Sequence, residues 1–149
     1  MKITKYAAID IGSNALRLLI SNVIEYKKET ITLKNSLVRV PIRLGEDAFT
    51  TGIISRNNIK QIIIAMKAFQ NLMKVHNVKN YLAFATAALR EAKNGKDVVD
   101  RVKKKSGINI QIINGKKEAK IISNSNDSEV FLGNIDFKKI KIRKIINNP

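Results

Sequence analysis

The sequence lacks cysteine and contains a single histidine, His76, among its 149 residues. The absence of cysteine excludes disulfide bonds, thiolate catalysis and zinc held by cysteine. One histidine is too few for a metal site built from several histidines. Chemistry that depends on a thiolate or on a histidine-rich metal centre is therefore not expected of this chain.

Long apolar runs are missing as well. No stretch approaches the roughly 20 residues that a membrane-spanning helix needs. The first ten residues, MKITKYAAID, show neither the long apolar region nor the small-residue cleavage site of a secretion signal, and Asp10 interrupts them early. We therefore expect a soluble, cytoplasmic protein with no membrane partner.

Acidic residues are scarce beside basic ones. The chain has 28 Lys and Arg against 12 Asp and Glu, a net charge of +16. This charge attracts anions, and nucleic acid, polyphosphate and anionic membranes are all compatible with it. Lys, Asn and Ile are abundant throughout, so a biased composition explains the charge equally well. Aromatic residues are only 5% and no recognition-helix motif is present, which disfavours nucleic acid.

The hydrophobic pattern begins with three strands. The apolar run at residues 6–11, its resumption at 15–24 and the alternation at 30–40 predict an antiparallel meander with its first turn at 12–14. The next ten residues, 43–52, have the composition of a loop. Apolar residues at helical spacing then predict a long helix that Ser55 caps and that ends near His76.

Shorter elements follow this helix. Buried strands are expected at residues 80–86 and 108–113, with a short helix capped by Thr86 and a second helix from Asn94 to Gly107 between them. A last helix is expected to begin near Glu118. The order βββαβαβα indicates an α/β domain with helices on a mixed sheet. The length suits one domain with a real core.

Polar residues interrupt the apolar run YAAIDIGSNALRLLI near its middle. A tight turn at Gly12, Ser13 and Asn14 would direct backbone N–H groups outward, as a phosphate site requires, and the two side chains would add donors. Asp10 could hold Mg²⁺ through water, because hard cations prefer oxygen ligands. An ordinary β-turn uses the same residues.

Two later stretches also carry candidate residues. In AFATAALREAKNG (83–95), the guanidinium of Arg90 could bind phosphate in a forked manner, or it could pair with Glu91 or Asp97 on the helix surface. In IINGKKEAKII (112–122), Glu118 could act as a general base for attack by water. Glutamate is also favoured in the first turn of any helix.

Together the three stretches resemble the N-terminal domain of the exopolyphosphatase/guanosine pentaphosphate phosphohydrolase (Ppx/GppA) family, from about Tyr6 to Ile122. The resemblance implies the actin, sugar kinase and Hsp70 ATPase fold, which is ribonuclease H-like. It also implies release of the terminal phosphate of polyphosphate or of guanosine pentaphosphate (pppGpp), with Mg²⁺ as cofactor.

The resemblance assigns a role to each candidate residue. Gly12, Ser13 and Asn14 match the family's first phosphate-binding loop, with Asp10 as the metal residue. Arg90 matches an arginine directed toward the phosphate. Glu118 matches the catalytic base, although the acidic residue that often precedes it is replaced here by Lys117.

The resemblance implies a domain 1–122 followed by a divergent basic segment 123–149. The family's second domain, which opens with a motif of the form D-[IVL]-G-G-G-S-T-E, has no counterpart after Glu118. A truncated gene or a half-size paralogue would explain this, and activity would then be impaired unless a homodimer or a separate chain supplies the second wall. A non-catalytic polyanion-binding module and a remnant without function are the alternatives.

Overall fold

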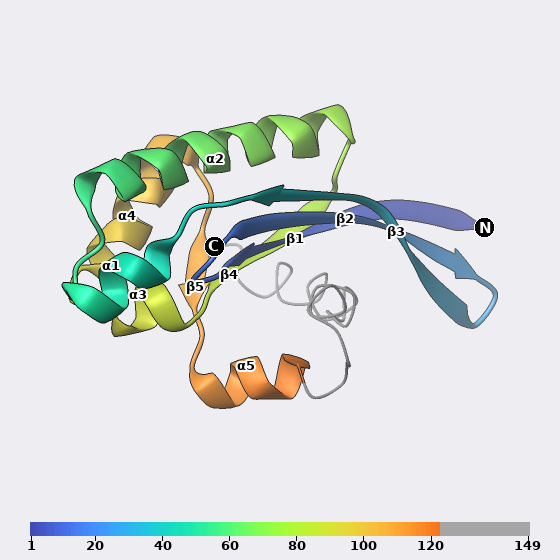
Figure 1. The fold of residues 1–149 in the computed structure, drawn as a ribbon. Coiled ribbons are helices and arrows are strands. Elements are labelled where there is room, and N and C mark those ends of the chain that lie inside the picture. The colour runs from blue at the N-terminus through green and yellow to red at the C-terminus, as the bar shows by residue number, and fades with distance from the viewer. Residues whose placement is uncertain (123–149) are drawn as a thin grey trace, which may run out of the picture.

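The computed structural model describes residues 1–122, with side chains through Ala119 (Figure 1). The strands are β1 (Lys2–Ile11), β2 (Leu16–Tyr26), β3 (Glu29–Val40), β4 (Asn80–Ala85) and β5 (Ile110–Ile112). The helices are α1 (Leu44–Thr50), α2 (Arg56–Val75), α3 (Ala87–Glu91), α4 (Gly95–Ser106) and α5 (Gly115–Ile122). The predicted segment 123–149 lies outside the described residues.

The five strands form one mixed sheet in the order β3-β2-β1-β4-β5. The pairs β1–β2 and β2–β3 are antiparallel, which confirms the predicted meander, whereas β1–β4 and β4–β5 are parallel. The antiparallel pairs need only short turns, while the parallel pairs are connected through helices. The predicted α/β class with a mixed sheet and flanking helices is confirmed.

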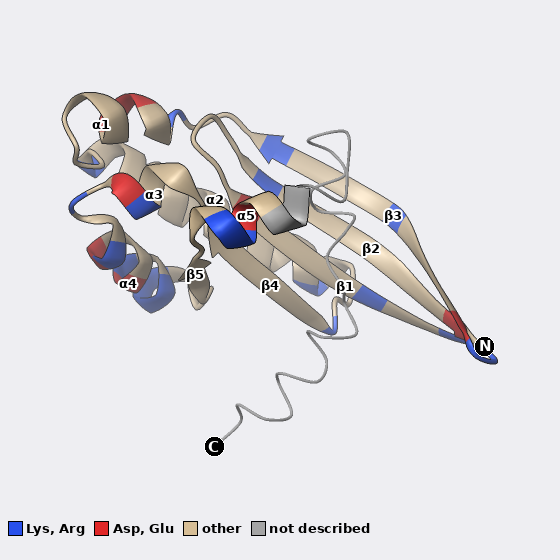
Figure 2. Cartoon of the chain, turned by 90° about the horizontal axis from the view of Figure 1, so that it is seen from below, with Lys and Arg blue, Asp and Glu red and all other residues tan. Residues whose placement is uncertain are grey.

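The main core lies between the sheet and α2. Side chains of one sheet face, including Ala7, Ile9 and Leu18, pack with buried residues of α2 such as Ile62 and Phe69. Successive strand residues alternate between faces, so the remaining residues of β1 and β2 belong to the opposite face. A smaller buried cluster lies there: Tyr6, Ala8, Leu19, Val23, Phe84 and Ile113. Helix α5 lies on this second side, away from α2 (Figures 1 and 2).

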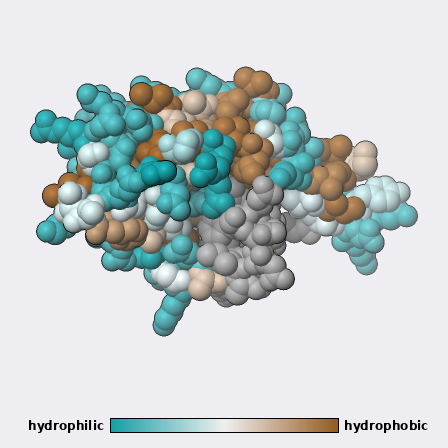
Figure 3. Space-filling view, in the orientation of Figure 1, coloured by the Kyte–Doolittle hydropathy of each residue, from teal (hydrophilic) through white to brown (hydrophobic). Residues whose placement is uncertain are grey.

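The strands β2 and β3 extend beyond the helices at the end that also carries the N-terminus (Figure 1). Apolar side chains gather at this end of the surface in Figure 3, where Ile3, Ile31 and Leu33 are exposed. No helix in the described part of the chain is long and apolar enough to cross a membrane.

Segment 43–52 was wrongly predicted as a loop, because Leu44–Thr50 forms helix α1. The residue before the helix, Arg43, provides no side-chain cap, so the usual start signal is missing. The helix is instead stabilised by burial of Leu44 and Ala48, which are four residues apart and therefore share a face.

The predicted caps had mixed outcomes. The Ser55 hydroxyl accepts from the Asn58 N–H (3.2 Å), and α2 ends as expected, with His76 as its C-cap. Gly107 closes α4 in the left-handed conformation. Thr86 and Asn94 precede their helices but make no side-chain capping bond. The Asn94 amide instead bonds both backbone groups of Ile54 at 2.9 Å, so it connects α4 to the segment before α2.

Candidate active site

Three parallel strands end in register, and a candidate segment follows each of them. Ile11 of β1 is paired with Ala85 of β4, and Ala85 with Ile112 of β5. The Thr86 N–H continues the ladder to the Ile11 carbonyl (3.2 Å), and the Ile113 N–H does so to the Ala85 carbonyl (3.0 Å). The loop after β1, the start of α3 and the start of α5 therefore lie at one edge of the sheet, where α/β proteins commonly bind ligands.

The loop after β1 is a closed turn braced by α1. The Gly12 N–H donates to the Ala15 carbonyl (3.1 Å), so this amide is not directed outward as the sequence suggested. The Gly45 N–H of α1 donates to the Ser13 carbonyl (2.9 Å). Within residues 1–119, the amides of Ser13 and Asn14 have no such partner. These two amides are therefore the loop donors that the described residues leave without a backbone acceptor.

Asp10 is buried at the end of β1, with 2% of its surface exposed. It faces Arg17 across the β1–β2 ladder, and the Arg17 Nε–H donates to Asp10 Oδ2 (3.1 Å). Burial raises the pKa of Asp10, and the Arg17 guanidinium opposes that rise. The Glu118 carboxylate also raises the pKa of Asp10, so the two acids influence each other electrostatically.

Arg90 and Glu118 form an ion pair that connects α3 to α5. Arg90 Nη1 donates to Glu118 Oε2 (3.1 Å) and to the Ile113 carbonyl (3.0 Å), and its Nε–H donates to Glu91 Oε1 (3.2 Å). The side chains of Arg90 and Glu118 are 27% and 24% exposed, so a ligand could reach both. The hydrogen bond to Glu118 raises the pKa of Arg90, whose guanidinium stays charged. The pairing with Glu91 that the sequence suggested is present, and Arg90 also reaches Glu118, while phosphate binding by Arg90 stays a prediction.

Asn114 fixes the start of α5. Its Oδ1 accepts from the Lys117 N–H (2.8 Å), and its carbonyl accepts from the Glu118 N–H (3.0 Å). This is N-terminal capping, which places Glu118 in the first turn of α5. Lys116 and Lys117 are exposed beside it. The basic residue that departs from the family pattern therefore lies on the solvent side of the site.

The described residues do not form a metal site on their own. Up to Ala119, no three His, Asp or Glu side chains gather closely enough to hold an ion. The two nearby carboxylates are each engaged by an arginine, Asp10 by Arg17 and Glu118 by Arg90.

Sequence reasoning missed three residues of this edge: Arg17, Gly45 and Asn114. Arg17 could have been found from the turn, because a hairpin that closes between Ile11 and Leu16 places residues 10 and 17 opposite each other. Asn114 had the signal of a capping residue directly before a glycine and a polar first turn. Gly45 gave no local signal, since its role is to approach a segment 32 residues away in sequence.

A mixed sheet with these polar segments at the shared edge of β1, β4 and β5 defines a domain of the actin, sugar kinase and Hsp70 ATPase type. The sequence model of the Ppx/GppA phosphatase family matches residues 22–131. The chain therefore belongs to the Ppx/GppA phosphatase family.

Individual relatives agree with this assignment. The chain is 27% identical over 117 residues to exopolyphosphatase 1 of Mycobacterium tuberculosis, covering 78% of this chain and 33% of that protein. It is 33% identical over 119 residues to the bifunctional 3-dehydroquinate synthase/phosphatase of Fusobacterium nucleatum, covering 77% of this chain and 18% of that protein.

Solved structures give the same result. A Ppx/GppA family member from Aquifex aeolicus superposes with a TM-score of 0.74 at 28% identity, covering 80% of this chain and 38% of that one. An exopolyphosphatase from Cytophaga hutchinsonii superposes with a TM-score of 0.69 at 28% identity. The match covers 80% of this chain and 37% of that one. The chain thus spans about a third of the length of the exopolyphosphatases it matches.

Proposed function

We propose that residues 1–122 supply one wall of a phosphohydrolase site that releases the terminal phosphate of polyphosphate or of pppGpp. The observation that carries the proposal is the Arg90–Glu118 pair, which lies at the same sheet edge as the loop 12–14. Attack by water on a phosphoryl group is helped by a general base and by donors that bind the phosphoryl oxygens. This edge offers a carboxylate, a guanidinium and two loop amides for these tasks. The relatives named exopolyphosphatase support polyphosphate as the first substrate to test.

Each group has a separate task in this proposal. Glu118 orients the attacking water and accepts its proton. Arg90 Nη1 holds Glu118 in place, and Nη2, which has no hydrogen bond to the residues described up to Ala119, is left to bind the phosphoryl oxygens. The amides of Ser13 and Asn14 bind the same oxygens from the loop. Such preorganised donors stabilise charge that develops during phosphoryl transfer.

The facing wall of the cleft would come from a second copy of the chain, from a separate chain or from a second domain. Removing a single preorganised donor costs about 10²–10³ in rate, so a site with one wall would be strongly impaired. Mg²⁺ would accompany the phosphate chain as the cofactor, and Asp10 would hold it through water.

The test is phosphate release from long-chain polyphosphate, and in parallel from pppGpp, with Mg²⁺ present. We expect Glu118→Gln and Glu118→Ala to reduce release by about 10²–10⁴-fold, the usual contribution of a general base. Glu91→Gln is the matched control, because Glu91 also pairs with Arg90 but is 57% exposed. Release that persists in both Glu118 variants would contradict the assignment of the base.

A non-catalytic polyanion-binding module is the second candidate, favoured by the net charge of +16. It predicts binding of polyphosphate that weakens as salt rises and that is unchanged in Glu118→Ala. Binding that is insensitive to salt would exclude it.

A further inference from the structure

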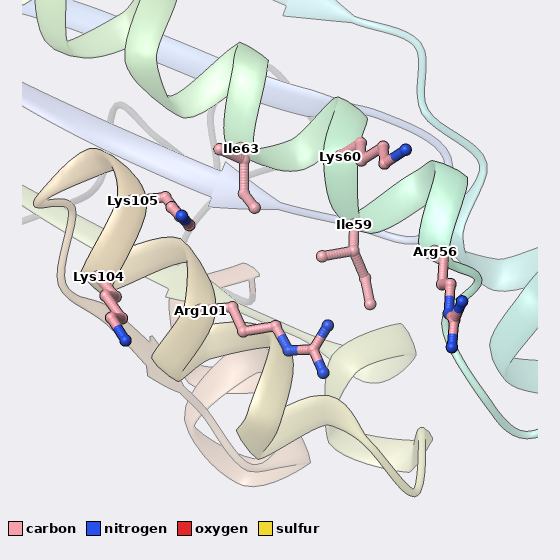
Figure 4. A pocket seen from close by; sticks show the side chains of 7 residues that line it. All are labelled: Arg56, Ile59, Lys60, Ile63, Arg101, Lys104 and Lys105. Atoms are coloured by element: carbon pink, nitrogen blue, oxygen red, sulfur yellow. The ribbon is translucent and has the colours of Figure 1, made fainter.

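A basic groove lies between α2 and α4, on the side of the sheet away from α5 (Figures 1 and 4). We call it the α2–α4 groove. Its volume is about 380 Å³. Its lining consists of two isoleucines and five cations: Arg56, Ile59, Lys60 and Ile63 of α2, and Arg101, Lys104 and Lys105 of α4.

The groove carries little opposing charge. Helix α2 contains no Asp or Glu from Arg56 to Val75. On α4, Asp97 pairs with Arg101 (3.0 Å), and the exposed Asp100 precedes Lys104 by one helical turn, so two acids offset part of the charge of this helix. In Figure 4 the side chain of Arg101 extends from α4 toward α2. Two opposed helix faces therefore concentrate positive charge on a concave surface, which raises the local concentration of an anion.

The positive charge also continues along α2. Lys67 and Lys74 follow Lys60 at intervals of seven residues, and Arg56 precedes Lys60 by four. All four therefore lie within one narrow stripe of the helix. All four are exposed. At 1.5 Å per residue the stripe is about 27 Å long. A linear row of cations matches a linear polyanion rather than a single small anion.

We propose that the α2–α4 groove and the stripe that continues it bind inorganic polyphosphate at a second site, separate from the Glu118 edge. The choice of polyphosphate rests on the function proposed above. It is favoured because no aromatic side chain lines the groove, so bases of a single-stranded nucleic acid would find no stacking partner there. The surface that lines the groove is almost entirely aliphatic, and the charged residues among those that line it are all cationic, which suits a slim chain that carries charge on every unit.

The test compares two triple variants with equal net charge. The groove variant is Lys60→Gln with Lys104→Gln and Lys105→Gln. The control variant is Lys28→Gln with Lys96→Gln and Lys103→Gln, three exposed lysines outside the groove. Circular dichroism melts establish that both fold. Fluorescence anisotropy with labelled long-chain polyphosphate then measures affinity in each as a function of salt.

We expect the groove variant to bind long-chain polyphosphate about tenfold or more weakly, with a shallower dependence on salt, while the control stays within about twofold of the parent chain. Tripolyphosphate, which is too short to follow the stripe, should show no such difference. Equal weakening in the two triple variants would overturn the proposal in favour of unspecific attraction. Single-stranded RNA that binds as tightly and depends on the same lysines would overturn the choice of polyphosphate.

Failure of this proposal is separable from failure of the proposed function. Glu118→Gln should leave the groove affinity unchanged, because the groove is on the other side of the sheet. A parent chain that releases no phosphate but binds polyphosphate in the groove would contradict the proposed hydrolase function and leave the groove proposal standing. Intact release with equal binding by both triple variants would count against the groove only.

Discussion

Asp10 illustrates how one residue can serve the sheet and the site at once. Its carboxylate is buried on the face of the sheet that α5 approaches, and Arg17 on the next strand is its direct partner. A buried acid without a partner is costly, so the pair is needed before any ligand is present. The hydrogen bond from Arg17 also leaves Asp10 with fewer free lone pairs to bind a metal ion.

We predict that Arg17→Met lowers the free energy of unfolding by about 2 kcal/mol at neutral pH. The value is below the 3–5 kcal/mol of fully buried pairs, because the Arg17 side chain is 23% exposed. Urea unfolding followed by circular dichroism measures it. Arg39→Met is the matched control, since Arg39 faces Arg17 from β3 but is exposed.

The Arg17→Met defect should depend on pH with a definite sign. The folded-state pKa of Asp10 is already raised, and loss of Arg17 removes an influence that lowers it, so the variant protonates Asp10 at higher pH than the parent chain. A neutral carboxyl does not need the guanidinium. The difference in stability should therefore shrink as pH falls through the two raised pKa values, and a difference that grows would contradict this explanation.

The site residues were predictable individually, but not their contacts. Asp10, Arg90 and Glu118 follow from motif and strand ends, and the structure places all three near one edge. The ion pair between Arg90 and Glu118 joins residues 28 apart in sequence, and no local pattern reports such a contact. The roles of these residues stay predictions until activity is measured.

At the scale of elements, Asp47 joins α1 to the start of α2. Its Oδ2 accepts from the Ser55 N–H and from Asn58 Nδ2, both at 2.8 Å. Partial burial acts to raise the pKa of Asp47, but these hydrogen bonds outweigh it and the net shift is downward. The carboxylate therefore stabilises the fold above its unfolded pKa, and this stabilisation is lost as pH falls through the lowered folded pKa.

We predict that Asp47→Ala lowers the free energy of unfolding by about 1 kcal/mol at neutral pH, as for loss of a helix cap. The difference should begin to shrink as pH falls below the ordinary pKa of an aspartate and should disappear once pH is below the lowered folded-state pKa of Asp47. Chemical unfolding at several pH values measures this. Glu46→Ala is the control, because Glu46 is an exposed neighbour that pairs with the exposed Arg43.

The junction of α3 and α4 depends on Gly95. A Cβ added there would lie 1.8 Å from the Leu89 carbonyl oxygen, so the backbone would have to move. We predict that Gly95→Ala destabilises the fold by about 1–3 kcal/mol. Gly115→Ala, where an added Cβ meets no described atom within 4 Å, should change stability by less than about 0.5 kcal/mol. Thermal melts of both variants test the contrast.

The elements most clearly predicted from sequence are those with a strong period. The six-residue β4 has a continuous apolar sequence after Asn80, and the 20-residue α2 has a wide apolar face. Both were predicted within a residue or two. Helix α1 has seven residues and no capping side chain, and it forms because α3 packs against it. Asn94 was predicted to cap α4 and does precede it, but its side chain bonds the backbone of Ile54 and not a helix amide. Gly95, the first residue of α4, gave no signal in the sequence of its close approach to Leu89.

At the scale of the whole molecule, a net charge of +16 means that the folded chain repels itself. We predict that the melting temperature rises between about 50 and about 500 mM NaCl, as screening weakens this repulsion. Long-chain polyphosphate should raise it further than NaCl of the same ionic strength, because it binds the folded state. Differential scanning fluorimetry measures both effects. A melting temperature that does not change with NaCl concentration would contradict the predicted effect of screening.

The shared register of β1, β4 and β5 also has a consequence for the order of folding. The β1–β2–β3 meander involves neighbouring segments and can form early, whereas pairing of β1 with β4 joins residues 74 apart, as between Ile11 and Ala85. The candidate site exists only after that late pairing. Hydrogen exchange at the amides of Thr86 and Ile113, which extend the two parallel ladders, would therefore report when a newly made chain acquires its site.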